Sequence, residues 1–413
     1  MRRVLLLLLV PLGATAAEPD AAVAEAARWV EARGCASGSY RSRAAPVVTE
    51  VEEAWTLKAD AIGSAPVHWD GRAYVVVRRD GDWRLLGLDL RTGEELASIG
   101  LKNFVIEAGI FVWDNMVLLQ PTEKQINGYV LEGRRFRLKW IFRGRRVYGA
   151  WQHPSSPVVH DNEVYCFLGD HLARLRPGSN FPSWRTDRSE MQKWRSRPSV
   201  HGPHVFVATL GERGWWSTQG NLISTLQLEV YRRSDGARVA AREICQAAVG
   251  GSNPDLTVTV SGDLVCIGSS WPLPSTAGWA SHVMVPKAIA DRELREGELG
   301  LSSYNRLPAL SRLGLVVVSG DPGDQVWKLY RDHRLWPLAY EKEQPDLFVD
   351  RVPPTVLGDV LYFGSWAMDL ETREILWRLP FTDVTQPVVP ADGLFLAVEG
   401  GRALRAFRGR GRR

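Results

Sequence analysis

One recurring unit in this sequence limits its possible folds more than any other feature. The unit consists of a Pro-x-Val start, a turn of Asp, Asn or Gly, and then an apolar strand. Its copies span residues 66–76, 157–165, 198–206, 308–318, 354–363 and 387–398, with weaker copies at 107–119 and 256–267. Self-similarity at intervals of roughly 33 to 57 residues is typical of propellers built from four-stranded blades. The sequence therefore predicts eight repeated units.

Most units end in a second shared element, which has the pattern of a β-hairpin. Residues 88–96 and 368–377 each contain a strand, a turn at Thr-Gly or Thr-Arg, and a further strand. The final strand of a unit often carries a tryptophan, as at Trp140, Trp184, Trp336 and Trp377. Short β-branched and aromatic runs between turn residues continue from about residue 46. The chain is therefore expected to be all-β, with four-stranded antiparallel units.

The two ends of the repeat region complement each other. The last unit, which begins at Pro387, has room for three strands and lacks a tryptophan-bearing fourth. An additional strand at 53–57 precedes the first unit and contains Trp55. If this strand pairs with the last unit, no sheet edge remains unpaired. The sequence thus predicts an eight-bladed β-propeller over residues 46–408, with an N-terminal strand that closes the last blade.

The N-terminus has the features of a secretory signal peptide. Arg2 and Arg3 precede an apolar run at 4–10, and small residues follow up to Ala17. The run is shorter than the roughly 20 residues that a membrane-spanning helix needs. We therefore expect residues 1–17 to be removed and the protein to reach the periplasm or the exterior. A retained N-terminal anchor is the alternative.

The regions that flank the repeats are expected to lie outside the propeller. Residues 18–45 form a leader in which helical spacing after Asp20, and Gly34 as a stop, predict a short helix. The basic tail at 409–413 is expected to be disordered. The whole chain has 51 Lys and Arg against 47 Asp and Glu, and this modest excess predicts no nucleic-acid partner.

Cysteine usage and short motifs limit the chemistry of the chain. There are 4 cysteines and no C-x2-C spacing, which excludes a disulfide-dense scaffold and a zinc framework. No H-E-x-x-H, G-x-S-x-G or P-loop motif occurs, so we predict no catalytic set and no metal site. Cys245 and Cys266 lie in neighbouring units and are the pair most able to form a disulfide. Buried free thiols are the preferred alternative.

The repeats resemble those of the pyrroloquinoline-quinone-type propellers. Residues 88–93 and 368–377 match the hairpin and terminal tryptophan of that family best, and the resemblance covers about residues 46 to 408. The resemblance implies the propeller fold. It implies two functional classes, because the family contains both quinone-dependent dehydrogenases and cofactor-free scaffolds such as the propeller lipoprotein of the outer-membrane barrel assembly machinery.

The sequence departs from the typical features of both classes. The dehydrogenases resembled carry an adjacent Cys-Cys disulfide and carboxylate and amide ligands for Ca²⁺, and neither feature can be matched to positions here. The scaffold lipoprotein carries a lipidated cysteine directly after its signal, where this chain has Ala16, Ala17 and Glu18. We therefore expect no cofactor and no lipid anchor. Pyrroloquinoline quinone with Ca²⁺ is expected only if the protein is a dehydrogenase.

Two insertions into the repeats are rich in tryptophan. Residues 211–220 contain Trp215 and Trp216, and residues 270–279 contain Trp271 and Trp279. Their Gly, Ser, Thr and Pro residues predict irregular, exposed loops after the second strand of each unit. Together with Trp151, which lies in a link between units, these tryptophans are predicted to form a binding face. The alternative is that they pack against their own loops.

A cluster of cations forms a second candidate site. The stretch 133–146 contains seven Lys and Arg and no acidic residue. The candidate anion patch consists of Arg134, Arg135, Arg143, Arg145 and Arg146. The preferred alternative is an outer strand whose alternate residues face solvent, with Trp140 as its packing residue.

From these features we expect an exported, non-enzymatic, monomeric propeller that is not membrane-spanning. It would act as a binding or assembly scaffold for a protein, small-molecule or glycan partner in the cell envelope. A quinone-dependent oxidoreductase is the main alternative, and a carbohydrate-binding propeller is the second.

Overall fold

A computed structural model describes most of the repeat region. The residues it describes are 41–42, 48–102, 110–113, 115–122, 125–143, 157–168, 171–176, 178–186, 192–211, 215–216, 222–249, 256–261, 264–275, 278–286, 309–310, 313–319, 326–331, 334–344, 354–357, 359–391 and 393–411.

The described residues form strands and contain no helix, so the all-β prediction is confirmed. The strands group into eight sheets, which we number in chain order. Sheet 1 contains β3 (Ala61–Ile62), β4 (Val67–Trp69), β5 (Arg72–Arg79), β6 (Asp82–Asp89) and β7 (Glu95–Leu101). Sheet 2 contains β8 (Ile110–Trp113), β9 (Met116–Thr122), β10 (Gln125–Glu132) and β11 (Arg135–Arg143). Sheet 3 contains β12 (Val158–His160), β13 (Glu163–Leu168), β14 (His171–Leu175) and β15 (Trp184–Arg185).

The next two sheets contain the tryptophan-rich insertions. Sheet 4 contains β16 (Gln192–Arg195), β17 (Ser199–His201), β18 (His204–Gly211), β19 (Trp215–Trp216), β20 (Leu222–Arg232) and β21 (Arg238–Val249). Sheet 5 has three strands in the described part of the chain, β22 (Leu256–Ser261), β23 (Leu264–Ser275) and β24 (Gly278–Pro286).

The last three sheets return the chain to its start. Sheet 6 contains β25 (Ala309–Leu310), β26 (Leu315–Ser319), β27 (Val326–Arg331) and β28 (Arg334–Tyr340). Sheet 7 contains β29 (Thr355–Leu357), β30 (Val360–Phe363), β31 (Trp366–Asp369) and β32 (Ile375–Arg378), with β1 (Arg41–Ser42) beside β29. Sheet 8 contains β33 (Val389–Ala391), β34 (Leu394–Glu399), β35 (Ala403–Gly411) and β2 (Val48–Lys58).

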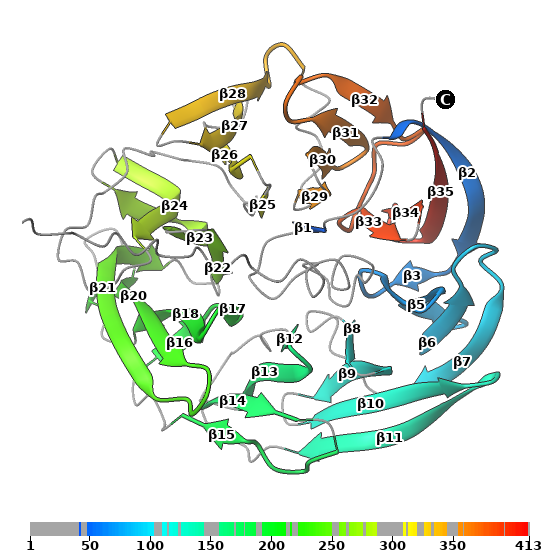
Figure 1. Ribbon diagram of the computed structural model, residues 1–413, viewed down its shortest axis with the longest axis horizontal. Helices are drawn as coiled ribbons and strands as arrows, with labels where there is room; N and C mark the ends of the chain where they lie inside the picture. The colour runs from blue at the N-terminus through cyan, green and yellow to red at the C-terminus, as the bar shows by residue number, and fades with distance from the viewer. Residues whose placement is uncertain are drawn as a thin grey trace, which may run out of the picture.

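The sheets follow one another around a ring, as in a β-propeller (Figure 1). The first strand of each repeat lies nearest the centre, and β4 contacts β8, β8 contacts β12, and β12 contacts β17. The last strand of each repeat lies at the rim, as β7, β11 and β28 do. Each of the eight predicted repeats therefore corresponds to one sheet among the described residues.

The core lies between the faces of neighbouring sheets rather than in one central cluster. Strand β5 shows why, because its residues from Ala73 to Val77 are all buried. Val75 and Val77 belong to the cluster shared with sheet 8, whereas Tyr74 and Val76 belong to the cluster shared with sheet 2. Alternate side chains of a strand point to opposite faces, so a strand covered on both faces is apolar at every position.

The predicted pairing of the N-terminal strand with the last repeat is confirmed. Strand β2 pairs antiparallel with β35, with Thr56 opposite Arg405 and Leu57 opposite Leu404. Arg405 also forms an ion pair of 2.6 Å with Glu53 across the two strands. The pairing extends to Gly411, so residues 409–411 are part of β35 and not of a disordered tail. The longer β2 provides backbone partners for them.

The end of the leader lies beside an inner strand of the ring. Strand β1 pairs in parallel with β29, with Arg41 opposite Val356 (Figure 1). The short helix predicted after Asp20 lies outside the described residues. In the part of the chain that the structure describes, no helix is long and apolar enough to cross a membrane.

The tryptophan-rich insertions differ from the irregular loops that their composition predicts. β19 pairs with β20, and Trp216 lies opposite Leu222. In sheet 5 the insertion extends β23 and β24 into a longer hairpin, in which Trp279 lies opposite Pro274. These segments form strands because their backbones pair with neighbouring strands. Gly and Pro do not prevent such pairing at the end or the edge of a strand.

Candidate functional site

A rim tryptophan donates a hydrogen bond to a turn of the next sheet at Trp140, Trp55 and Trp184, and the rings of the last two also pack onto a glycine of that turn. Trp55 of β2 donates a hydrogen bond from Nε1 to the Leu90 carbonyl oxygen at 2.9 Å. Trp184 of β15 donates one to the Arg233 carbonyl oxygen, also at 2.9 Å. Both side chains are only 9% exposed. Rim tryptophans therefore join neighbouring sheets, as the repeat pattern predicts for packing residues.

The receiving turns need glycine. Gly93 and Gly236 have φ angles of 73° and 75°, in the left-handed region. A Cβ atom on Gly93 would lie 2.6 Å from the ring of Trp55, and one on Gly236 would lie 2.5 Å from the ring of Trp184. Non-bonded carbon atoms do not approach this closely. A side chain at this position of the turn would therefore clash with a tryptophan packed as Trp55 and Trp184 are.

Sheet 7 has the same turn with an arginine in place of the glycine. Arg373 donates its backbone N–H to the Asp369 carbonyl oxygen at 2.8 Å, as Gly93 does to Asp89 at 2.9 Å. The carboxylate of Asp369 accepts the N–H of Thr372 at 2.8 Å, which fixes the turn. The turn holds Arg373 at a φ of 65°, a conformation that is uncommon for a residue with a Cβ atom.

The rim tryptophan that faces this turn is Trp336 of β28, and it is not packed. Its side chain is 43% exposed, in contrast to Trp55 and Trp184. Among the described residues its indole nitrogen has no hydrogen-bond partner. By analogy with Gly93 and Gly236, we attribute this exposure to the Cβ atom of Arg373. The contact between sheets 6 and 7 is therefore open at its rim.

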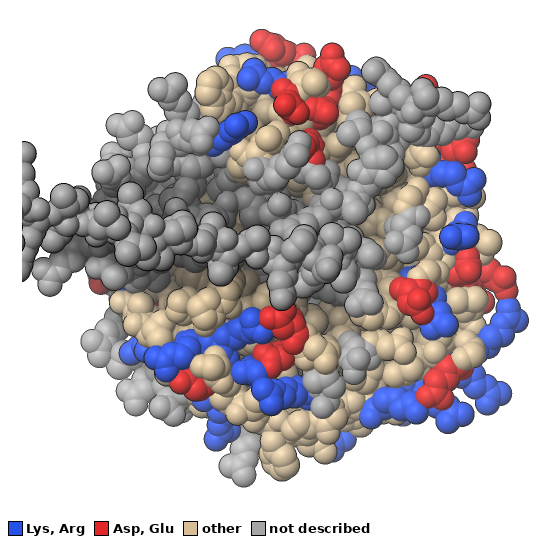
Figure 2. Space-filling view, viewed as in Figure 1, with Lys and Arg blue, Asp and Glu red and all other residues tan. Residues whose placement is uncertain are grey.

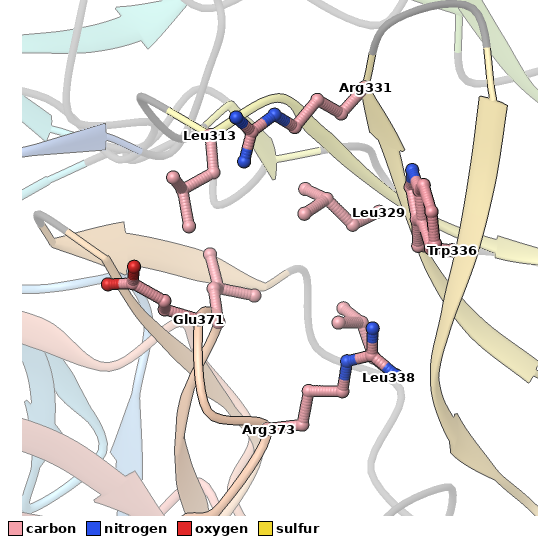
Figure 3. Close-up of a pocket in the computed structure, with 8 residues that line it drawn as sticks. Leu313, Leu329, Arg331, Trp336, Leu338, Glu371 and Arg373 are labelled. Carbon is pink, nitrogen blue, oxygen red and sulfur yellow. The ribbon is translucent and has the colours of Figure 1, made fainter.

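A pocket of about 330 Å³ lies at this open contact (Figure 3). Trp336 stands on one side of it, on β28, and the turn that carries Glu371 and Arg373 stands on the other. The rest of the lining consists of Leu313, Leu329, Leu338, Leu370 and Arg331. Leu329 and Leu370 are buried, at 6% and 2% exposed, and provide an apolar floor.

The lining combines apolar and charged side chains. Its volume is at the lower end of the range of ~300–1,000 Å³ that is usual for ligand sites. Among the described residues Arg373 has no ion-pair partner, so its guanidinium adds positive charge to the edge. With a single carboxylate among these eight lining residues, the pocket has no pair of acids for acid–base chemistry.

A second polar cluster, between sheets 3 and 4, connects the two sheets. Glu163 accepts hydrogen bonds from Arg174 and, at 2.7 Å, from the hydroxyl of Tyr165. Arg233 of sheet 4 donates from Nε to the same hydroxyl at 2.9 Å. Burial, together with the bond to Glu163, raises the pKa of Tyr165 above its usual range. Each group is paired within the cluster, so we assign it a structural role.

The predicted tryptophan face is only partly placed. Trp215 and Trp216 lie in β19, Trp271 lies in β23 and Trp279 lies in β24. Their side chains, and Trp151 as a whole, lie outside the described residues. The face therefore stays a prediction.

The predicted anion patch lies on an exposed outer strand, and part of it is paired with acids. In β11 the side chains of Arg135 and Arg143 are exposed, and Trp140 between them is buried. Arg134 forms an ion pair with Glu94 of sheet 1. Figure 2 shows basic and acidic side chains interspersed along this part of the rim. Arg145 and Arg146 lie outside the described residues, and anion binding stays a prediction.

The cysteines and the possible cofactor can be assessed in part. Cys166 and Cys266 are buried free thiols. The possible Cys245–Cys266 disulfide is therefore not formed, and Cys266 is a buried free thiol, as the preferred alternative predicts. The side chain of Cys245 is not among those described. Within the described residues, no group of three or more His, Cys, Asp or Glu side chains could hold a metal ion.

The sequence pattern does not predict the open contact, because Trp336 has the same position at the end of a repeat as Trp140, Trp184 and Trp377. The signal for it lies in the hairpins at 88–96 and 368–377, which differ at one turn position. Thr92 is followed by Gly93, whereas Thr372 is followed by Arg373. Its consequence becomes apparent only when the turn and Trp336 are seen to face each other.

The fold is similar to that of several solved structures at low sequence identity. BamB from Moraxella catarrhalis superimposes with a TM-score of 0.54 at 11% identity, covering 88% of this chain and 99% of that one. Quinohemoprotein alcohol dehydrogenase from Comamonas testosteroni gives a TM-score of 0.59 at 11% identity, covering 96% of this chain and 83% of that one. No protein-family model matches the sequence, and neither does any curated protein sequence. At the level of the fold, the resemblance to the pyrroloquinoline-quinone-type propellers is confirmed.

Proposed function

We propose that this protein is an exported, non-enzymatic β-propeller that acts as a binding or assembly scaffold in the cell envelope. The observation that carries the proposal is the open contact between sheets 6 and 7. There, an exposed Trp336 stands over buried leucines, whereas Trp55 and Trp184 close the equivalent contacts. Tryptophan and arginine are the residues most enriched at the centres of protein interfaces.

The architecture supports this function. Buried apolar clusters join most neighbouring sheets in the described part of the chain, so the ring provides a rigid frame on which surface sites are held in place. The chain also spans nearly the whole length of BamB, at 99%, which is compatible with a protein of that size and shape. The signal-peptide pattern of residues 1–17 supports export.

The binding function can be tested by site-specific photo-crosslinking in the cells that produce the protein. A photoreactive amino acid replaces Trp336, and the same residue replaces Leu138 as a control. Leu138 is 46% exposed on β11, so the two positions are matched in exposure but lie on different sheets. We expect one partner, identified by mass spectrometry, to be captured at position 336 only. Equal capture at both positions would contradict the proposal.

The main alternative is a quinone-dependent oxidoreductase, because the fold is also that of quinohemoprotein alcohol dehydrogenases. Purified protein can be titrated with pyrroloquinoline quinone in the presence of Ca²⁺. We expect no saturable binding. Saturable binding together with dye-linked oxidation of an alcohol or a sugar would overturn the scaffold proposal.

A further inference from the structure

We infer that the pocket between sheets 6 and 7 receives an aromatic or large aliphatic side chain of a partner protein, next to a carboxylate of the same partner. The inference rests on the proposed scaffold function and names the chemistry of the partner at that site. It follows from the size and the apolar floor of the pocket, from the charges at its edge, and from the way Arg373 keeps it open.

The size and the lining point to one inserted side chain. The volume of about 330 Å³ holds a single aromatic residue with part of its backbone. Leu329 and Leu370 form a buried floor, and Trp336 offers an exposed aromatic face. Aromatic rings pack favourably against such a face, and burial of the apolar area provides the free energy of binding. The leucines of the floor offer no side-chain hydrogen-bond partner to the hydroxyl groups of a sugar.

The charges at the edge point to a neighbouring carboxylate. Arg331 and Arg373 line the pocket with a single acid, Glu371. Within the described part of the chain Arg373 forms no ion pair, and its planar guanidinium is suited to a bidentate contact with a carboxylate. Because the turn fixes the backbone of Arg373, the origin of its side chain is also fixed.

Arg373 has two separable effects in this site. Its Cβ atom prevents Trp336 from packing into the turn, and its guanidinium supplies charge at the edge. Arg373→Gly restores the residue found at positions 93 and 236, so Trp336 can pack and the pocket closes. Arg373→Asn keeps a Cβ atom and tolerates the left-handed conformation, so the pocket stays open without the charge. The two variants therefore separate shape from charge.

The test uses the full mature protein and a fluorescein-labelled, amidated peptide, Gly-Ser-Gly-Phe-Asp-Gly-Ser-Gly. Fluorescence polarisation measures its affinity, with the Phe→Ser and Asp→Asn peptides as controls. We expect Phe→Ser to weaken binding by about tenfold or more, because the buried ring is lost. We expect Asp→Asn to weaken it by about three- to tenfold, because the charged contact is lost.

The protein variants give a second, independent set of outcomes. Trp336→Ala and Arg373→Gly should each weaken binding of the Phe-Asp peptide by about tenfold or more. Arg373→Asn should retain the preference for Phe over Ser but lose the preference for Asp over Asn, which is the coupling expected of a direct contact. Melting temperatures of the three variants, measured in parallel, show that each one is folded.

Three results would overturn the inference. They are no binding of the Phe-Asp peptide to the wild-type protein, equal binding of the Phe-Asp and Ser-Asp peptides, and unchanged binding to Arg373→Gly. If the crosslink at position 336 forms but the peptides are not distinguished, the inferred partner chemistry is wrong and the scaffold function stands. If the crosslink also fails, both proposals are wrong.

Discussion

The rim tryptophans show how much one turn residue can change the role of a side chain. Trp184 packs on Gly236 and donates a hydrogen bond to Arg233, whereas Trp336 faces Arg373 and stays exposed. Both tryptophans follow from the same repeat pattern. Their opposite environments predict opposite effects on stability and on binding.

Trp184→Ala should destabilise the protein much more than Trp336→Ala. Loss of a buried aromatic side chain typically costs ~3–5 kcal/mol, whereas a change at an exposed position is usually within about 0.5 kcal/mol. Denaturant unfolding of both variants against the wild type measures the difference. If Trp336→Ala is as destabilising as Trp184→Ala, Trp336 is a packing residue and the open contact has no basis.

The buried thiols should make the protein less stable in alkali. Burial raises the pKa of Cys166 and that of Cys266 to about 12, whereas a thiol in the unfolded chain titrates near 8.5. Because the folded pKa is the higher one, this contribution to stability is complete below about pH 8.5 and is lost as the pH rises towards 12. Cys166→Ala should therefore flatten the fall of the denaturation midpoint between pH 8 and pH 11.

Reactivity provides the control for this prediction. The thiolate is the reactive form, so neither thiol should react with Ellman's reagent at pH 8 while the protein is folded. A background with Cys35→Ser and Cys245→Ser isolates the two buried thiols. Rapid reaction of the folded protein would show that they are accessible.

At the scale of single elements, β2 connects the start and the end of the repeat region. It pairs with β35 along most of its length, and Trp55 of the same strand packs into the turn of sheet 1. One strand thus completes sheet 8 and joins it to sheet 1. The ring depends on this element more than on the leader before it.

Deletion of residues 1–58 should therefore make the protein insoluble or abolish a single cooperative unfolding transition. The deletion leaves the edge of β35 unpaired, and an unpaired edge is a template for aggregation. The matched control removes residues 18–40 and keeps β1 and β2. Size-exclusion chromatography and thermal unfolding distinguish the two forms, and an unchanged transition after the longer deletion would refute the role of β2.

At the scale of the whole molecule, the ring carries two candidate binding surfaces. The predicted tryptophan face belongs to sheets 4 and 5, through β19, β23 and β24. The pocket belongs to sheets 6 and 7. A propeller can use such surfaces for different partners, because each sheet carries its own insertions.

Substitutions at the two surfaces should separate their roles. Trp216→Ala and Trp271→Ala should leave the melting temperature nearly unchanged, because both tryptophans are predicted to belong to an exposed binding face rather than to the packing between sheets. They should not alter binding of the Phe-Asp peptide, whereas Trp336→Ala should. Loss of peptide binding in all three variants would indicate one continuous surface, or a common loss of structure that the melting temperatures would reveal.

Much of the fold follows from the sequence itself. The β-branched and aromatic runs, the Thr-Gly and Thr-Arg hairpin turns and the missing fourth strand of the last unit are local patterns, and each one indicates which strands can pair. They were sufficient to predict the all-β class, the eight repeated units and the pairing of β2 with β35. Composition alone could not predict that the insertions at 211–220 and 270–279 contain paired strands, because pairing depends on the length of the neighbouring strand.

The candidate site, by contrast, was decided only by the tertiary structure. We attribute the exposure of Trp336 to a Cβ atom in the turn of the next sheet, and no pattern within β28 indicates that exposure. The sequence specifies that Arg373 replaces a glycine and that Trp336 ends a repeat. Only the packing of sheet 6 against sheet 7 brings the two residues together. The ring of Trp336 and the side chain of Arg373 can exclude each other only where the fold directs both to the same space.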